Sequence, residues 1–190
     1  MKKRLVIFEG IASSGKTTLE RLFVERVPGS VIIHEDETLA PLFDNRDVEI
    51  ARQHLLGFFD RFSRETAPVL VIDRFHFSHA FRTHSALDNF QDIEERLLEE
   101  YCPIVFLLYM DEAAIAERIR KTTELRGDAW AKGKKGSLDE RVAYYTDQQR
   151  MVMKFAEHSV LPIVRIDTTD EDWERCIGQV LEAYSRILEP

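Results

Sequence analysis

The segment from Gly10 to Thr17 has the residue types and the spacing of a loop that binds phosphate. It reads GIASSGKT and matches the pattern G-x-x-x-x-G-K-[ST]. In such loops the backbone N–H groups and the start of the following helix bind anionic phosphates, and glycine permits the close approach. We expect Lys16 to bridge the β- and γ-phosphates of a nucleotide and Thr17 to place its hydroxyl on Mg²⁺. The expected nucleotide-binding residues of the loop are Gly10, Ile11, Ala12, Ser13, Ser14, Gly15, Lys16, Thr17 and Thr18.

The residues on either side of this loop predict the elements that it needs. Leu5–Phe8 is a short β-branched and aromatic run, typical of a strand buried on both faces. The segment 17–27 carries Leu19, Leu22 and Phe23 at the spacing of an amphipathic helix. Because strand, loop and helix come in the required order, we interpret the motif as a nucleotide site and not as a chance glycine-rich turn.

The rest of the chain predicts an α/β fold. Further strands are expected in four apolar runs, at 31–33, 69–72, 104–109 and 163–166. Segments with helical period lie between them, the clearest at 138–156, and a turn at 44–47 precedes a long helix over 48–65. Strands that alternate with helices form right-handed βαβ units. We therefore predict one three-layer α/β domain over residues 1–190, with a five-stranded parallel sheet flanked by helices.

Composition excludes several classes of protein. The chain has 26 Lys and Arg against 34 Asp and Glu, a net charge of −8, which argues against a dedicated nucleic-acid binder. With 44% hydrophobic residues it is not disordered. Cys102 and Cys176 are too few for a disulfide scaffold. The basic start at Met1–Arg4 leads into an apolar run that Glu9 and Gly10 interrupt, so we expect no signal peptide, no membrane partner and a cytoplasmic location.

One segment lacks the periodic pattern. Residues 122–136, TTELRGDAWAKGKKG, are rich in Gly and Lys and have little apolar periodicity. We predict a mobile, cationic surface loop there.

A nucleotide site leaves many activities open, and other motifs narrow them. The N-K-x-D and D-x-x-G strings of GTPases do not occur in the sequence. A motor protein would need more than 190 residues. Phosphotransferases that act on small molecules remain.

The order of three motifs resembles the thymidylate kinase family. The motifs are Phe8-Glu9-Gly10 leading into Gly15-Lys16-Thr17-Thr18, Asp73-Arg74-Phe75 with Ser78 after the third strand, and Ala116-Glu117-Arg118-Ile119 after the fourth. The related deoxynucleoside kinases share much of this layout. The resemblance implies a P-loop kinase fold with a lid at about 122–136, ATP and Mg²⁺ as cofactors, a small nucleoside or nucleotide as acceptor, and a possible homodimer.

The resemblance also implies roles for charged residues. Asp73 would hold Mg²⁺ together with Thr17, and Arg74 would clamp the transferred phosphoryl group. Arg118 would close over ATP, supported by cations that follow it in the lid. Asp73, Arg74 and Arg118 form the expected catalytic set together with Lys16. Phosphoryl transfer is accelerated chiefly by positioning of the reactants and by positive charge near the transferred group. The cations that follow Arg118 are Arg120, on the same helix, and Arg126, Lys132, Lys134 and Lys135 in the lid.

For the acceptor, the resemblance points to the segment 55–62. Arg61 matches a family arginine that hydrogen-bonds the edge of the base. The aromatic residue that stacks on the base in the family aligns with Gly57 here, and Phe58 is the next residue. Phe62 and Phe75 are further candidates for contact with the acceptor. The helical spacing of Phe58 and Phe62 equally predicts core positions.

Two departures from the family pattern leave the acceptor open. Ala12 stands where the family usually has Asp, and Glu35 stands in an acidic stretch where the family binds the acceptor phosphate. Glu35 matches instead the general base of deoxynucleoside kinases, which a hydroxyl acceptor needs and a phosphate does not. Our first expectation is a kinase of a nucleoside monophosphate. The alternatives are a nucleoside kinase that uses Glu35, a kinase of another hydroxyl compound, and a nucleotide-binding regulatory protein with little turnover.

Overall fold

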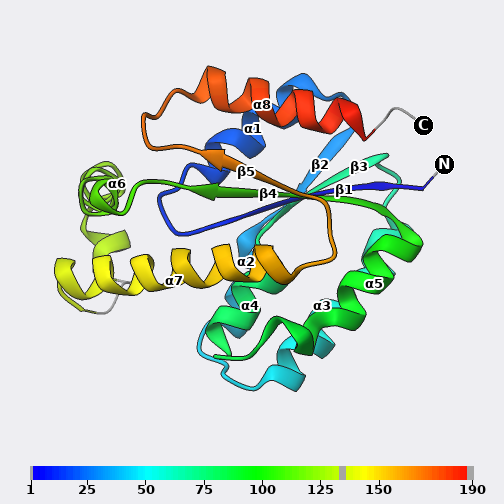
Figure 1. The fold of residues 1–190 in the computed structure, drawn as a ribbon, viewed down its shortest axis with the longest axis horizontal. Coiled ribbons are helices and arrows are strands. Elements are labelled where there is room, and N and C mark those ends of the chain that lie inside the picture. The colour runs from blue at the N-terminus through cyan, green and yellow to red at the C-terminus, as the bar shows by residue number, and fades with distance from the viewer. Residues whose placement is uncertain (1, 133–135, 188–190) are drawn as a thin grey trace.

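A parallel sheet of five strands runs through the middle of the molecule (Figure 1). The structure, a computed structural model, describes residues 2–132 and 136–187. The strand order is β2-β3-β1-β4-β5, with all pairs parallel. The strands are β1 (Arg4–Gly10), β2 (Ser30–Ile33), β3 (Val69–Asp73), β4 (Cys102–Tyr109) and β5 (Ile163–Asp167). This confirms the predicted three-layer fold, and each strand contains its predicted run.

Helices cover both faces of the sheet (Figure 1). On one face lie α1 (Lys16–Arg26) and α8 (Trp173–Arg186). On the other lie α3 (Val48–Arg64), α4 (His76–Arg82), α5 (Gln91–Glu100) and α7 (Leu138–His158). The remaining elements are α2 (Glu35–Thr38), α6 (Glu112–Lys132) and the short 3₁₀ helices η1 (Ala40–Leu42) and η2 (Leu87–Phe90). Within the part of the chain just described, no helix has both the length and the apolar composition to cross a bilayer.

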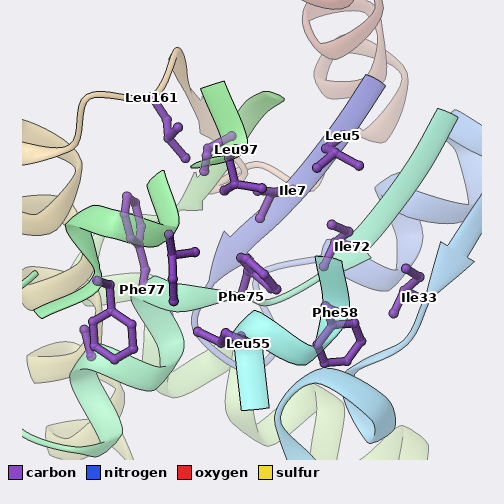
Figure 2. Close-up of a cluster of buried hydrophobic side chains, with 14 of the residues drawn as sticks. Leu5, Ile7, Ile33, Leu55, Phe58, Ile72, Phe75, Phe77, Leu97 and Leu161 are labelled. Atoms are coloured by element: carbon purple, nitrogen blue, oxygen red, sulfur yellow. The ribbon is translucent and has the colours of Figure 1, made fainter. Parts of the chain in front are cut away.

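The alternation of side chains along β1 divides the core into two layers. Val6 and Phe8 pack toward α1 and α8, whereas Leu5 and Ile7 pack toward α3, α4 and α5. Figure 2 shows the second layer, in which Phe75 lies among side chains from β1, β3 and α3. Because each buried side chain of this size contributes roughly 1.5–3 kcal/mol, the sheet is fixed rigidly against both helix layers.

The register of the central strands positions the functional loops. Phe8 on β1 pairs with Asp73 on β3 and with Phe106 on β4. The loop that follows β1 therefore emerges between the ends of its two neighbours. Ligands of open α/β sheets bind at such carboxyl ends.

The segment 122–136 differs from its prediction. Residues 122–132 continue α6 and are helical, so the predicted surface loop is wrong for them; Lys134, Lys135 and the side chain of Lys132 lie outside the described residues. None of residues 122–126 is buried, and Leu125 is 87% exposed, so this stretch has no apolar period that would predict a helix. Its Glu, Leu, Arg and Ala residues are nevertheless good helix formers.

Candidate active site

The loop after β1 requires glycine at both ends. Gly10 has φ 144°, and a Cβ there would lie 2.6 Å from the carbonyl oxygen of Leu108. Gly15 has φ 93°, and a Cβ there would lie 2.3 Å from the Trp173 ring. The loop is thus packed between β4 and the start of α8, which holds its backbone in one shape.

Lys16 is the first residue of α1 and is buried within the loop. Its ammonium donates hydrogen bonds to the carbonyls of Ile11 (2.9 Å) and Gly10 (3.2 Å). Burial, with a contribution from Arg74, lowers the pKa of Lys16 to about 8. The side chain therefore curls over the loop, where a phosphate would meet it.

Arg74 connects the end of β3 to the loop. Its Nη1 donates to the Gly10 carbonyl at 2.7 Å, and its Nε lies 3.2 Å from Oε1 of Glu35. Burial alone would lower the pKa of Arg74, but Glu35, Asp73 and Glu9 raise it above the usual value. Arg74 is thus a fixed, buried cation between the loop and α2.

Glu9 holds the turn that carries Arg74. One oxygen of its buried carboxylate accepts from the backbone N–H of Phe75 (2.8 Å) and of Ser78 (3.3 Å), and the other accepts from the Ser78 hydroxyl (2.6 Å). These bonds tie the end of β1 to the start of α4. Glu9 therefore acts as a positioning residue for the whole Asp-Arg-Phe turn.

Two carboxyl groups lie beneath the loop. Asp73 ends β3, and Glu20 extends from α1, four residues after Lys16. Burial, and then Asp73, raise the pKa of Glu20 to about 9, and burial raises the pKa of Asp73. Oδ1 of Asp73 has no hydrogen-bond partner among the described residues.

These residues fit a divalent cation. Thr17 lines the cavity above the loop, and Asp73, at the end of β3, has a buried carboxyl oxygen without a hydrogen-bond partner among the described residues. Mg²⁺ usually takes one or two carboxylates and completes its shell with water and substrate phosphates, so a larger cluster of acidic ligands is not needed.

A first cavity of about 340 Å³ opens over the loop. Arg118 lies at its side, where Nη1 donates to the Ser13 carbonyl at 3.3 Å and Nη2 to the Thr168 carbonyl. Its guanidinium also lies 5.5 Å from the centre of the Trp173 ring. The cavity is lined by Ala12, Ser13, Gly15, Lys16, Thr17, Thr18, Glu35, Arg74, Arg118, Thr122, Leu125, Arg126, Glu171 and Trp173.

A second cavity of about 560 Å³ meets the first. Both are lined by Ala12, Glu35 and Arg74, so these residues stand at their junction. The wall of the second cavity includes a stacked pair, because the Arg82 guanidinium lies 3.8 Å from the centre of the Phe43 ring. Its other residues are Asp44, Arg46, Gly136, Glu140, Arg141, Tyr144, Tyr145 and Gln148.

The sequence-predicted site residues divide into two groups. The structure brings together the phosphate-binding loop with Lys16, Glu35, Asp73, Arg74 and Arg118 at the carboxyl ends of the strands.

The predicted acceptor-binding residues lie elsewhere. Phe58, Phe62 and Phe75 belong to the core between the sheet and α3. Figure 2 shows Phe58 and Phe75 packed there among other apolar side chains. The assignment of these three rings to the acceptor is therefore corrected, because apolar packing governs their positions. Arg61 forms an ion pair with Glu37, lowering the pKa of that carboxyl by its hydrogen bond, and lines neither cavity; its role toward an acceptor stays a prediction.

Several residues of the two cavities had no sequence prediction. Trp173 lines the first cavity, and Phe43, Arg82 and Tyr144, which are distant in the sequence, all line the second. Of these residues, Trp173 alone could have been found from the sequence, because it is an aromatic residue shortly after the carboxyl end of a strand, at Asp167.

Comparisons with known proteins were made at the level of sequence and of structure. No family model matches the chain, and no curated protein matches it in sequence. The YorR protein from Bacillus subtilis, in complex with phosphorylated GDP, is 18% identical with a TM-score of 0.61, covering 95% of each chain. Thymidylate kinase from Ehrlichia chaffeensis is 16% identical with a TM-score of 0.60, covering 97% of this chain and 100% of its own.

A third solved structure is deoxyadenosine kinase from M. mycoides with bound dATP. It is 16% identical with a TM-score of 0.59, covering 96% of this chain and 99% of its own. The chain described here has the same fold as these three proteins.

The corrected position of Phe62 can be tested against Tyr144, which is 40% exposed and lines the second cavity. We expect Phe62→Leu to lower the free energy of unfolding by about 1–3 kcal/mol, because it leaves a gap in the core. Tyr144→Leu should change stability by less than about 0.5 kcal/mol. Denaturant unfolding of both variants measures this; equal stability losses would contradict the assignment.

Proposed function

We propose that the protein is an ATP-dependent kinase that phosphorylates a hydroxyl group of a nucleoside-like acceptor, with Glu35 as general base. The observation that carries the proposal is the junction of the two cavities, where Glu35 and Arg74 face both. ATP would occupy the cavity over the loop and the acceptor would occupy the second one. The γ-phosphoryl group would then cross the junction.

The residues of the first cavity suit this transfer. Lys16 and Arg74 are fixed cations on either side of the path, and positive charge that is already in place stabilises the transition state. A divalent cation held by Thr17 and Asp73 would neutralise charge on the phosphate oxygens. Arg118, bonded to the loop and to the segment after β5, would close the side of the nucleotide site.

Glu35 is placed for proton transfer. It is the first residue of α2, and its side chain is 41% exposed, so an acceptor can reach it. The end of α2 is anchored, because Thr38 donates to the Asp73 carbonyl (2.6 Å) while ring nitrogens of His54 and His79 lie 3.0 and 2.8 Å from its own carbonyl oxygen. These contacts fix α2, and the ion pair with Arg74 orients the Glu35 side chain, which supports a role for Glu35 as general base.

The second cavity supports a nucleoside-like acceptor. Its volume of about 560 Å³ lies in the usual range for small-molecule sites. Phe43, Tyr144 and Tyr145 supply aromatic surface, and Gln148 supplies an amide that can pair with the edge of a base.

A nucleoside monophosphate, the first expectation from the sequence, is the second candidate. The specific observation in its favour is that four arginines line the acceptor cavity: Arg46, Arg74, Arg82 and Arg141. Arginine binds phosphate well. Glu35 argues against it, because an ionised phosphate needs no base and is repelled by a carboxylate.

A lid over ATP is also part of the proposal. The last turns of α6 contribute Thr122, Leu125 and Arg126 to the cavity over the loop, which places them to close on a nucleotide. The two cysteines are unpaired, which supports a reducing compartment such as the cytoplasm.

Replacing the loop lysine tests the nucleotide site. We expect Lys16→Met to keep the far-UV circular dichroism spectrum and to lower phosphoryl transfer by roughly 10²–10³-fold, because one preorganised cation is lost from the transition state. Lys154→Met, at an exposed position on α7, serves as the control and should retain full activity. Full turnover in Lys16→Met would contradict the assignment of the loop.

Replacing Glu35 distinguishes the two acceptors. With a hydroxyl acceptor, Glu35→Gln should lower kcat by roughly 10²–10⁴-fold while the KM for ATP stays nearly constant, because proton transfer is lost. With a monophosphate acceptor, kcat should fall little and acceptor binding should improve. Steady-state assays with matched nucleosides and monophosphates measure both; Asp36→Asn, on the neighbouring residue of α2, is the control.

Hydrogen exchange tests the lid. Addition of a non-hydrolysable ATP analogue should slow amide exchange in residues 122–132, because closure removes the end of α6 from solvent. Unchanged exchange at saturating analogue would show that this helix does not act as a lid.

A further inference from the structure

Three arginines of the second cavity have no carboxylate partner. They are Arg46 before α3, Arg82 on α4 and Arg141 on α7, and they line this cavity but not the first. In the described part of the chain they form no ion pair, and their hydrogen bonds go to backbone carbonyls: Arg46 to Arg82 (2.8 Å), Arg82 to Phe43 (2.9 Å) and Arg141 to Ser137 (3.4 Å). Cations that are shielded from water without a counter-charge are costly, so this cluster indicates an anionic ligand.

Arg82 is the most buried of the three. It is 9% exposed, and the Phe43 ring on which it stacks fixes the plane of its guanidinium. Nη1 is engaged with the Phe43 carbonyl, whereas Nη2 has no hydrogen-bond partner among the described residues and, unlike Nε, is not sealed from solvent. A fixed cation therefore keeps a donor for a ligand in the second cavity.

The carboxylates of this cavity do not neutralise the three arginines. Glu140 accepts from the backbone N–H of Ser137 at the start of α7 (2.6 Å), and Glu35 pairs with Arg74 at the junction of the cavities. Asp44 is exposed to solvent. The arginines thus supply positive charge that an incoming ligand can use.

An acceptor with two functional groups suits both parts of the cavity. Glu35 suits a hydroxyl group that gives up a proton, and it repels an anion. The arginines suit a phosphate monoester, which carries about two negative charges and accepts hydrogen bonds from several guanidinium groups at once. A carboxylate, with one charge, matches three cations less well.

We propose that Arg46, Arg82 and Arg141 form a subsite for a phosphate monoester that the acceptor carries in addition to the hydroxyl group that reacts. The acceptor is then a nucleoside-like compound already phosphorylated away from that hydroxyl. In the transfer, the hydroxyl oxygen bonds to the γ-phosphorus of ATP, its proton goes to Glu35, and ADP leaves. The phosphate in the subsite orients the acceptor and does not react. This inference deepens the proposed kinase function and rests on it.

Isothermal titration calorimetry of the full chain, without ATP or Mg²⁺, tests the subsite. The ligands are the common 2′-deoxynucleosides, their 3′-monophosphates, which keep the 5′-hydroxyl free, and their 5′-monophosphates. For at least one base, the 3′-monophosphate should bind roughly 10-fold more tightly than the nucleoside, because it gains charged hydrogen bonds. Arg82→Gln should remove most of this difference.

Two further variants complete the test. Arg96→Gln is the matched control, because Arg96 also stacks on a phenylalanine, 4.1 Å from the centre of the Phe59 ring, but lines neither cavity. It should keep the full difference. Arg141→Gln changes a half-buried position, so it tests the subsite even if Arg82→Gln fails to fold, and it should reduce the difference several-fold. Far-UV circular dichroism checks the fold of each variant.

Three results would overturn the inference. The first is equal affinity for the nucleoside and its 3′-monophosphate with every base, and the second is an unchanged difference in folded Arg82→Gln or Arg141→Gln. The third is a loss of affinity in these variants that is at least as large for the 5′-monophosphate, because the arginines would then hold the phosphate that reacts. The titrations involve no turnover. An inactive protein that prefers 3′-monophosphates would therefore count only against the proposed function, and an active nucleoside kinase without this preference would count only against the subsite.

Discussion

The bond network of Glu9 is the interaction on which the site depends. The Glu9 carboxylate at the end of β1 fixes the turn that follows β3. This turn places Arg74 against the phosphate-binding loop. Arg74 has φ 62°, a conformation that costs a non-glycine residue about 1 kcal/mol or more. The surrounding hydrogen bonds hold Arg74 in this conformation, because leaving it would break the bonds of a buried guanidinium.

The two cavities rest on one rigid sheet. The first is lined by the phosphate-binding loop, whose place the sheet register fixes, and by residues from several helices. The second is lined largely by residues of α4, α7 and the segment before α3. Such walls change readily by substitution while the fold beneath them stays the same.

The sequence predicts the fold and the phosphate-binding loop because both depend on local patterns. Consecutive apolar residues indicate the strands, and eight consecutive residues match the loop motif. The second cavity depends on contacts between distant residues, such as the stacking of Arg82 on Phe43, and no periodicity encodes these. Phe62 was misassigned because a core face and an aromatic platform have the same helical spacing. The continuation of α6 beyond residue 121 was not predicted because residues 122–126, which are not buried, carry no apolar stripe.

The packing of Trp173 against Gly15 has a spectroscopic consequence. The indole packs against the glycine that precedes the loop lysine and also lines the cavity above it, so we expect its emission to change when a ligand enters that cavity. The chain has two tryptophans, Trp130 and Trp173, and a Trp130→Phe variant would leave Trp173 as the single tryptophan. Ligand binding in the cavity can then be followed by tryptophan emission, in unlabelled protein and without any turnover.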